Sequence, residues 1–346
     1  MSNTNYKGIV FQPKEVAAIG FNATLMASEF KDVGIPLNIA GGKLSEYFAP
    51  LLPWEICAVQ AQTHNGKTMF VDWWERETIR HLQQNGQAGD IVHVSLEESI
   101  EAMAFTEYGR LLDVIPAKLA RGEYSDIAKL KVAYTQIGDS RIWRIGESGE
   151  PPDKDLLDKP DEAAGDLTLS NIYRALKAMQ EGEISTSTKI RLITVDYLQT
   201  LPIDPEVKAV ALDAQRRLQV RNDVYRLRKM TVKLKAPILV PVQAKQILSG
   251  ANPPYQIPGI YDGEETASIA QRFDRIVSLW MPKVIMPVGT KVYKGDEPVF
   301  TVEEDQVFLK VNKQRGGLPS GKTFELKVDY MKREYYDAYG KPRSNV

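Results

Sequence analysis

The stretch Ile56-Cys57-Ala58-Val59-Gln60-Ala61-Gln62-Thr63-His64-Asn65-Gly66-Lys67-Thr68 decides the fold. It combines an apolar strand, a short polar turn and the start of a predicted helix. That order is typical of a phosphate-binding loop, in which backbone N–H groups and the positive helix end hold phosphates. Lys67 would lie between the β- and γ-phosphates, and the Thr68 hydroxyl would hold Mg²⁺. Ala61 stands where the usual G-x-x-x-x-G-K-[ST] pattern has its first glycine, so this stretch alone leaves a chance match open.

Composition agrees with a folded domain of ordinary character. The 346 residues are 43% apolar and 26% charged, which is typical of a globular protein with a packed core. This length suits one large α/β domain with attachments, or two modest domains. The net charge of −1 excludes a uniformly basic coat for nucleic acid, although a local basic surface stays compatible with it.

Several features predict a cytoplasmic protein with no membrane segment. No apolar run approaches the ~18 residues that suggest a membrane span. The first five residues lack the basic-then-apolar pattern of a secretory signal. The single cysteine, Cys57, lies in an apolar strand. It has no intrachain partner for a disulfide, and we expect it to be buried in a reducing compartment.

Predicted strands and helices alternate along the chain. The expected strands are 56–61, 91–96, 141–145, 189–196, 237–243 and 274–280, with further strands within 299–330, and the expected helices are 67–84, stretches within 97–134, 168–180 and 205–234. This alternation indicates a mostly parallel central sheet flanked by helices. Glu97, Asp196 and Gln243 each follow the end of a predicted strand, as the loop of Lys67 does. Since ligands bind at the carboxyl ends of parallel strands, these groups together predict a nucleotide site.

An amphipathic helix is predicted over 14–30, before the phosphate-binding loop. Its apolar residues recur at spacings of three and four, and glycine and proline follow it at 34–36. Two interpretations stand equally on this pattern. The helix either packs on its own domain or docks on a neighbouring subunit.

Further short motifs follow the phosphate-binding loop in order. They are Val94-Ser95-Leu96-Glu97-Glu98-Ser99, Val195-Asp196-Tyr197-Leu198-Gln199, Pro241-Val242-Gln243, Ser268-Ile269-Ala270-Gln271-Arg272-Phe273-Asp274 and Lys313-Gln314-Arg315-Gly316-Gly317. With the loop at 61–68 they resemble, over about residues 34–330, the RecA-like motor domain of DnaB-type replicative hexameric helicases. The resemblance therefore implies a RecA-like P-loop NTPase, with the helix at 14–30 similar to that family's linker helix.

The resemblance implies ATP as substrate and Mg²⁺ as cofactor. The nucleotide-binding residues would be Gln62, Thr63, His64, Asn65, Gly66, Lys67, Thr68 and Met69. Asp196 would hold the Mg²⁺ shell opposite Thr68. On the residues alone, however, His64 is better interpreted as an ordinary polar loop residue than as a nucleotide contact.

Hydrolysis would follow the same family pattern. Glu97 would polarise the attacking water as general base, and Gln243 would sense the γ-phosphate. Lys313 and Arg315 would reach the phosphates of an adjacent subunit, where an arginine supplied in trans can contribute on the order of 10³–10⁵ in rate. We therefore expect almost no turnover without assembly into a ring, most simply a hexamer.

Each of these assignments has a plainer alternative. Glu97 and Glu98 could both be carboxylates at a helix N-terminus; with the resemblance, Glu97 is the base and Glu98 the partner of the helix dipole. Arg315 in a glycine-rich turn could be a solvated turn residue. Trp73 and Trp74 are interpreted as core and interface packing. The histidines at 81 and 93 lack the spacing of metal ligands, and we assign them no site.

Nucleic-acid contacts are predicted for the loop at 245–267, at Lys245, Glu265, Thr266 and Ala267, with Arg221, Arg226 and Arg228 of the basic helix as weaker candidates. Repeated around a ring, such basic residues would line a channel for single-stranded DNA. One departure opposes this: Glu264 stands where the family commonly has a phosphate-contacting arginine.

The predicted organisation is an extension with the docking helix at 1–33, a motor at 34–331 and a polar, frayed tail at 332–346. The family's N-terminal collar domain has no counterpart in this sequence. The acidic loop at 146–166 is either tolerated surface or a partner site. The predicted function is an ATP-hydrolysing ring helicase on single-stranded DNA, with a primase, a loader or a mobile-element protein as possible partner. The alternative is an ATP-dependent scaffold or clamp of the RecA/KaiC type, which recruits partners without unwinding.

Overall fold

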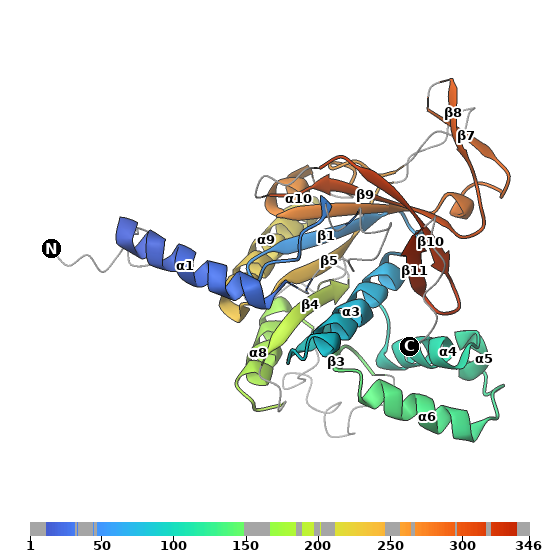
Figure 1. Cartoon of the computed structure of the whole chain (residues 1–346), viewed down its shortest axis with the longest axis horizontal. Coiled ribbons are helices and arrows are strands. Elements are labelled where there is room, and N and C mark those ends of the chain that lie inside the picture. Colours follow the sequence, from blue (N-terminus) through green and yellow to red (C-terminus); the bar gives the residue numbers. More distant parts are fainter. Residues whose placement is uncertain are drawn as a thin grey trace.

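The computed structural model describes residues 12–31, 33, 44, 47–148, 167–184, 189–196, 201, 212–245, 257–263, 267–294, 296–315 and 320–337. Within them one sheet of nine strands forms the centre of the molecule, in the order β11-β10-β9-β6-β1-β5-β4-β2-β3 (Figure 1). The strands from β6 to β3 run parallel, whereas β9, β10 and β11 extend the sheet with antiparallel pairs.

Most predicted elements lie within a few residues of their observed bounds. The strands of the sheet are β1 (Ile56–Ala61), β2 (Asp90–Ser95), β3 (Ile142–Ile145), β4 (Ile190–Asp196), β5 (Ile238–Gln243), β6 (Arg275–Trp280), β9 (Gln306–Lys313), β10 (Thr323–Asp329) and β11 (Glu334–Asp337). The helices are α1 (Pro13–Glu29), α3 (Lys67–Gln84), α4 (Ile100–Leu112), α5 (Pro116–Ala120), α6 (Ile127–Gly138), α8 (Leu169–Gln180), α9 (Leu212–Leu234), α10 (Ala267–Arg272) and the short 3₁₀ helix η4 (Pro282–Val284). The first part of the predicted 205–234 helix and most of the 146–166 loop lie outside the described residues.

Helices cover both faces of the sheet, and the alternation of β1 shows why. Cys57 and Val59 belong to the core cluster that contains the apolar residues of α3. Ile56 and Ala58 belong to the cluster that contains those of α8 and α9. Successive side chains of a strand point to opposite faces, so a strand that is apolar throughout is buried on both sides. Every residue of β1 is buried, as predicted for Cys57.

The predicted polar tail from residue 332 is wrong for 334–337, because this segment forms β11 at the edge of the sheet. Tyr335 is buried, and its ring centroid lies 5.2 Å from those of Phe70 and Trp73 on α3. Both predicted core tryptophans, Trp73 and Trp74, are buried as expected. The sheet thus ends in an aromatic cluster over the helix that follows the phosphate-binding loop.

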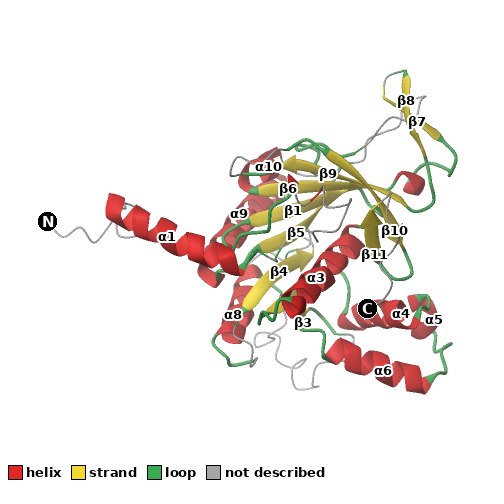
Figure 2. Cartoon of the chain, viewed as in Figure 1, coloured by secondary structure: helices red, strands yellow, loops and turns green. Residues whose placement is uncertain are grey.

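A hairpin of β7 (Lys291–Lys294) and β8 (Glu297–Thr301) projects from the body (Figure 2). The sequence predicted a strand near β8 but not β7 or the hairpin. Its base is closed by a small core in which Val292 and Val302 pack with Trp280 and Phe308.

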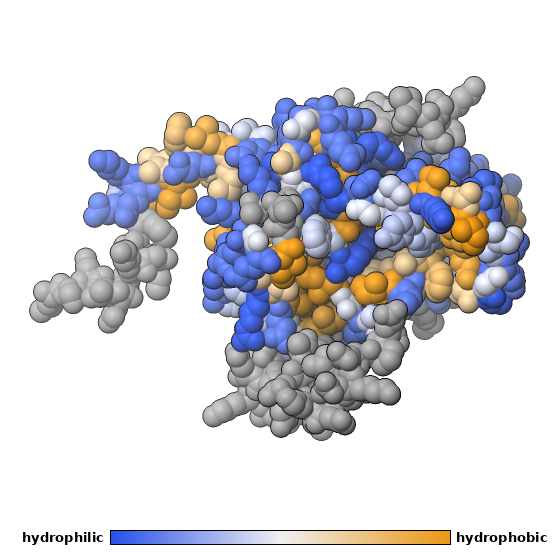
Figure 3. All heavy atoms as spheres, turned by 90° about the horizontal axis from the view of Figure 1, so that it is seen from below, coloured by the Kyte–Doolittle hydropathy of each residue, from blue (hydrophilic) through white to orange (hydrophobic). Residues whose placement is uncertain are grey.

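Helix α1 projects from the opposite side, as Figure 1 shows, and none of its residues is buried. Several apolar side chains of α1 are each more than half exposed, namely those of Val16, Ile19, Phe21 and Leu25. Apolar residues are visible on the surface of this helix in Figure 3. Its C-terminal end is held firmly. Arg191 of β4 donates to the carbonyl of Glu29 at 2.9 Å and lies over the ring of buried Phe30. The predicted helix is confirmed, and it is not packed along its own domain.

Candidate nucleotide site

The turn between β1 and α3 has the backbone of a tight anion-binding loop. Gly66 caps α3 in the left-handed conformation, with φ 72° and ψ 25°, and a Cβ there would collide with the side chain of Met281. The positive φ favours glycine at this position, and any larger residue would also have to displace the end of the Met281 side chain. Asn65 fixes the loop from inside: its Nδ2 donates to the carbonyl of Thr63 at 3.1 Å, and its Oδ1 accepts from the backbone N–H of Met281 at 2.7 Å.

Polar side chains from three adjacent strands meet above this loop. The ammonium of Lys67 donates to Gln243 Oε1 at 2.8 Å, at the end of β5, and the amide of Gln243 donates to the hydroxyl of Thr63. Thr68 donates to Asp196 Oδ2 at 2.8 Å, at the end of β4. Strand ends that are far apart in sequence therefore bring Lys67, Thr68, Asp196 and Gln243 together, as the parallel topology requires.

The other predicted loop residues have different surroundings. Gln62 is buried and donates to the carbonyl of Lys245 at 3.3 Å. His64 is exposed and adopts a positive φ of 63°, which costs a non-glycine residue conformational energy. Met69 turns into the core on the first turn of α3. Their side chains hold the shape of the turn, whereas its phosphate contacts would come from backbone N–H groups.

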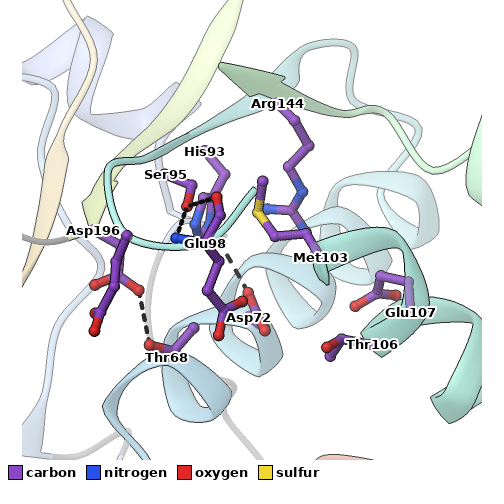
Figure 4. A pocket seen from close by; sticks show the side chains of 11 residues that line it. Thr68, Asp72, His93, Ser95, Glu98, Met103, Thr106, Glu107, Arg144 and Asp196 are labelled. Carbon is purple, nitrogen blue, oxygen red and sulfur yellow. Dashed lines mark hydrogen bonds and ion pairs between the residues drawn. The ribbon is translucent and has the colours of Figure 1, made fainter. Parts of the chain in front are cut away.

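An acidic pocket opens beside Thr68 and Asp196 (Figure 4). Glu97, Glu98 and Asp72 line it from the loop after β2 and from α3. Glu97 is exposed to solvent, so a water molecule can reach its carboxylate. Glu98 directly precedes Ser99, the N-cap of α4, and its side chain also lines the pocket, so its interpretation as a partner of the helix dipole stays a prediction. Burial, reinforced by the Asp72 carboxylate, raises the pKa of Glu98.

Thr68 and Asp196 form an oxygen-donor pair suited to a hard cation such as Mg²⁺. Burial raises the pKa of Asp196 to about 6, although His93 and the hydrogen bond from Thr68 oppose the shift. The carboxylate is thus poorly solvated in the folded chain, and a bound cation would favour its charged form. The donor atoms present fit the cofactor implied by the sequence.

Lys313 and Arg315 lie at the opposite edge of the sheet. Strand β9 runs antiparallel to β6, and Lys313 pairs with Ile276 at the beginning of β6. Arg315 bonds to Asp274, whose backbone N–H donates to the carbonyl of Ile56 at the start of β1. The five steps along the strand from Ile56 to Ala61 cover ~17 Å at ~3.3 Å per step. The two predicted cations are therefore remote from the loop of their own chain.

Comparison with solved structures places this arrangement in a known fold. One solved ATPase domain of a DnaB-like replicative helicase superimposes with a TM-score of 0.64 at 16% identity, over 95% of this chain and 99% of that one. A longer DnaB-like replicative helicase, in a structure that describes its interactions with primase, also gives a TM-score of 0.64 at 16% identity, over 94% of this chain and 68% of that one. The fold is that of a DnaB-like helicase ATPase domain. No protein-family model matches the sequence, and no curated protein is similar to it in sequence.

The fold class predicted from the sequence is thus confirmed, and the DnaB-like sheet explains how distant motifs assemble. The C-terminal strand ends carry the phosphate-binding loop, Asp196 and Gln243 in one row. At the other edge, Lys313 ends β9 and Arg315 lies in the bend that follows it. Among the described helices, none is both long and apolar enough to cross a bilayer.

Behind the pocket of this DnaB-like domain lies a buried ionic network that sequence reasoning missed. His93 Nδ1 lies 2.8 Å from Glu75 Oε1, and Arg144 lies 3.1 Å from the other carboxylate oxygen. Burial would raise the pKa of Glu75, but His93 and Arg144 outweigh it and lower this pKa to about 2. Asp72 is paired with Arg333 at 2.7 Å.

These contacts decide between two interpretations of the cluster. Asp72, Glu75 and His93 offer atoms close enough to hold a metal ion. However, arginines already neutralise both carboxylates, so the cluster is better explained as an ionic brace for α3. The only sequence signal was the presence of charged residues on a helix that is otherwise buried.

The predicted nucleic-acid residues are not brought together. Arg228 on α9 pairs with Asp274 at 3.2 Å, at the sheet edge of Arg315. Lys245 follows β5 at the other edge, and its backbone N–H donates to the carbonyl of Asp262 at 2.8 Å. Ala267 begins α10, whereas Glu265 and Thr266 lie outside the described residues. The placement of Arg228 separates it from Lys245.

Proposed function

We propose that this chain is an ATP-hydrolysing ring motor that moves on single-stranded DNA, as a DnaB-type helicase does. The observation that carries this proposal is the separation of the two half-sites. The phosphate-binding loop and carboxylates lie at one sheet edge, and Lys313 and Arg315 lie at the other. A head-to-tail interface between identical chains joins such unlike edges and closes into a ring when the rotation permits.

The proposed chemistry uses this chain's residues in defined roles. Lys67 exchanges its contact with Gln243 for the β- and γ-phosphates, and the amide of Gln243 then faces the γ-phosphate. Glu97 accepts a hydrogen bond from the attacking water and orients it. Magnesium, held at Thr68 and Asp196, would supply positive charge beside the phosphate oxygens. Arg315 of the adjacent chain would stabilise the charge that develops on the transferred group.

Assembly in this proposal depends on α1. A helix with no buried residue and several exposed apolar side chains lowers its free energy by packing against another surface. A second copy of the chain is the proposed acceptor, and six copies the proposed ring. The extension would then span 1–33, while the motor, proposed as 34–331 from sequence, extends at least to Asp337 because β11 belongs to the sheet.

The substrate strand and partner proteins are the least constrained parts of this proposal. Single-stranded DNA would pass the loop that follows Lys245, and a primase, a loader or a mobile-element protein would bind the ring. The cytoplasmic location expected from the sequence stays a prediction. The alternative, an ATP-dependent scaffold without unwinding, is favoured by Glu264, an acidic residue where the DnaB family has a cation.

One experiment separates the two candidates. ATP hydrolysis by the full chain is measured with and without single-stranded DNA, while the mass of the assembly is recorded under the same conditions. A motor should show hydrolysis by the oligomer that rises severalfold or more with DNA. Hydrolysis at the same rate with and without DNA supports the scaffold. An oligomer that binds no ATP contradicts both the motor and the scaffold.

A further inference from the structure

Asp274 occupies an unusually constrained position at the entrance to β6. Its backbone N–H donates to the carbonyl of Ile56 at 3.0 Å, and its Oδ2 accepts from the Ile56 N–H at 3.2 Å. The side chain is only 6% exposed. Both contacts tie the carboxylate to the beginning of the central strand β1, so it cannot turn towards solvent.

Two arginines share the remaining oxygen of this carboxylate. Arg315 Nη1 lies 3.1 Å and Arg228 Nη2 lies 3.2 Å from Oδ1 of Asp274. The two side chains are 43% and 41% exposed, respectively. A buried carboxylate needs one counter-charge to offset its desolvation. A second guanidinium on the same oxygen is repelled by the first and can therefore be given up at little cost.

The two arginines differ in how they are held. Arg228 projects from the middle of the long helix α9, and its Nη1 also approaches the carbonyl of Arg272 at 3.5 Å. Arg315 lies in the bend after β9 and otherwise donates to the carbonyl of Gln271 at 3.0 Å. Because a residue in a bend moves more readily than one in the middle of a helix, Arg315 is the arginine that can leave. It also stands where the family resemblance places a trans-acting cation.

We propose that Asp274 is the resting position of Arg315, and that Arg228 is a positioning residue that neutralises Asp274 while Arg315 reaches the nucleotide of an adjacent copy. This inference rests on the proposed function. Without Arg228, the departure of Arg315 would leave the buried Asp274 carboxylate without an ion pair. The free-energy cost of the unpaired carboxylate would then raise the barrier to hydrolysis in every turnover. The arginine thus serves the hydrolysis step and not a nucleic-acid contact.

Steady-state ATPase kinetics of the full chain test this without DNA. Arg228→Gln should lower kcat on the order of 10- to 100-fold, because an unpaired buried charge costs this much, while KM for ATP changes less than about twofold. Arg228→Gln combined with Asp274→Asn should recover most of the lost kcat, since no charge is left to neutralise. Lys233→Gln, at an exposed position later on the same helix, is the control and should match the wild type.

Mixed rings distinguish positioning from general damage. Arg228→Gln subunits mixed with Glu97→Gln subunits should regain activity, since the latter supply Arg315 next to an intact Arg228. The same subunits mixed with Arg315→Ala subunits should gain no activity above the low level of Arg228→Gln alone, since every remaining Arg315 then lacks its Arg228. Equal behaviour of both mixtures, or no rescue by Asp274→Asn, would overturn the inference.

The outcomes also separate this inference from the proposed function. If the wild type hydrolyses ATP and Arg228→Gln has the same kcat, the proposed role of Arg228 is wrong, whereas the proposed ring motor is unaffected. A wild-type chain that forms rings and binds ATP but never hydrolyses it removes both. Arg228→Lys, which keeps the charge without the planar fork, should lie between the wild type and the glutamine variant.

Discussion

Lys67 Nζ lies 2.8 Å from the amide oxygen of Gln243, across the boundary between the phosphate-binding loop and strand β5. The ammonium also approaches the carbonyl of Ala61 at 3.4 Å, at the end of β1. In the nucleotide-free chain these uncharged oxygens hold the cation over its own loop. An incoming triphosphate competes with them through full negative charge, which forms the stronger hydrogen bonds.

Lys67→Ala should therefore weaken ATP binding about 10- to 100-fold, as expected for a lost charge-assisted contact of roughly 1.5–3 kcal/mol. Affinity is measured with a fluorescent ATP analogue by anisotropy, in the absence of DNA. Lys245→Ala, close by at the same sheet edge, is the matched control and should keep wild-type affinity. Unchanged affinity in Lys67→Ala would remove the nucleotide site from this loop.

Arg315→Ala should retain ATP affinity within a few-fold and lose hydrolysis by at least a factor of ~10³, the lower bound for an arginine supplied in trans. Glu97→Gln should behave in the same way for a different reason, the loss of its water-orienting carboxylate. Rings mixed from the two variants should recover part of the activity, because some interfaces combine an intact Glu97 with an intact Arg315. Mixed rings that form but stay inactive would place Arg315 outside the reaction.

The magnesium dependence of nucleotide binding should fall off below pH 6. Burial raises the pKa of Asp196 to about 6, so the carboxylate is charged above that pH and neutral below it. The affinity for magnesium with a non-hydrolysable ATP analogue should fall by up to tenfold per pH unit below 6. Titration calorimetry from pH 5 to 8 measures this.

The raised pKa of Asp196 affects the stability of the fold in the opposite direction from its effect on magnesium binding: stability is lost, not gained, as pH rises. A carboxyl group whose pKa is raised in the folded chain binds more protons there than when unfolded, so its contribution to stability decreases as pH rises from about 4 to 6. Asp196→Asn should abolish the pH dependence of magnesium affinity and that of stability. If the magnesium affinity of the wild type does not change with pH over this range, the assignment of Asp196 to the metal is wrong.

Replacing Phe21 and Leu25 of α1 by glutamate should dissociate the oligomer without unfolding the subunit. Both side chains are more than half exposed in the single chain, so the change in the free energy of unfolding should stay within about 0.5 kcal/mol per site. Sedimentation at equal protein concentrations measures the assembly, and Lys14→Gln on the same helix is the control. Point substitutions are better here than deleting 1–31, because Phe30 is buried in the main core. An unchanged mass would show that α1 is not the ring contact.

Tyr335→Ala should lower the free energy of unfolding by about 3–5 kcal/mol, as large-to-small substitutions of buried aromatic residues do. Its ring fills the space between Phe70 and Trp73 at the end of the sheet. Tyr336→Ala, the next residue and on the other face of β11, should cost about 1 kcal/mol or less. Urea unfolding measures both, and equal values would mean that β11 does not anchor the sheet.

Long apolar segments made the centre of the fold predictable. Strands β1, β4, β5 and β6 are mostly apolar, and their alternation with helices along the chain indicates a parallel sheet. That arrangement was enough to place Lys67, Glu97, Asp196 and Gln243 at one edge. The resemblance to a known motor added the role of Glu97 as general base, and it added Lys313 and Arg315, whose roles no local pattern reveals.

Short or exposed elements were not predictable for physical reasons. Among the β11 side chains that the structure describes, at positions 334–336, Tyr335 is the only buried one, and one inward side chain gives no alternation to detect. The ion-pair partners of Arg228, His93 and Asp72 come from other parts of the chain. Because the sequence does not show that these residues meet in the fold, each of them looks like an ordinary solvated charge. The position of Glu98 beside Asp72 was not predicted for the same reason, since Asp72 lies on a different element.

Strand β6 begins next to Asp274, which holds Arg315, and ends next to Met281, whose N–H is bound by Asn65 of the phosphate loop. It is clamped on both sides by ladders to β1 and β9 and cannot stretch. A single strand of six residues, ~20 Å long, therefore joins the loop proposed to bind ATP to the arginine proposed to reach the next subunit. In a closed ring, the β6 strands of successive subunits would follow one another from site to site. A movement caused by ATP cleavage at one site would then be transmitted through a rigid strand to the next site.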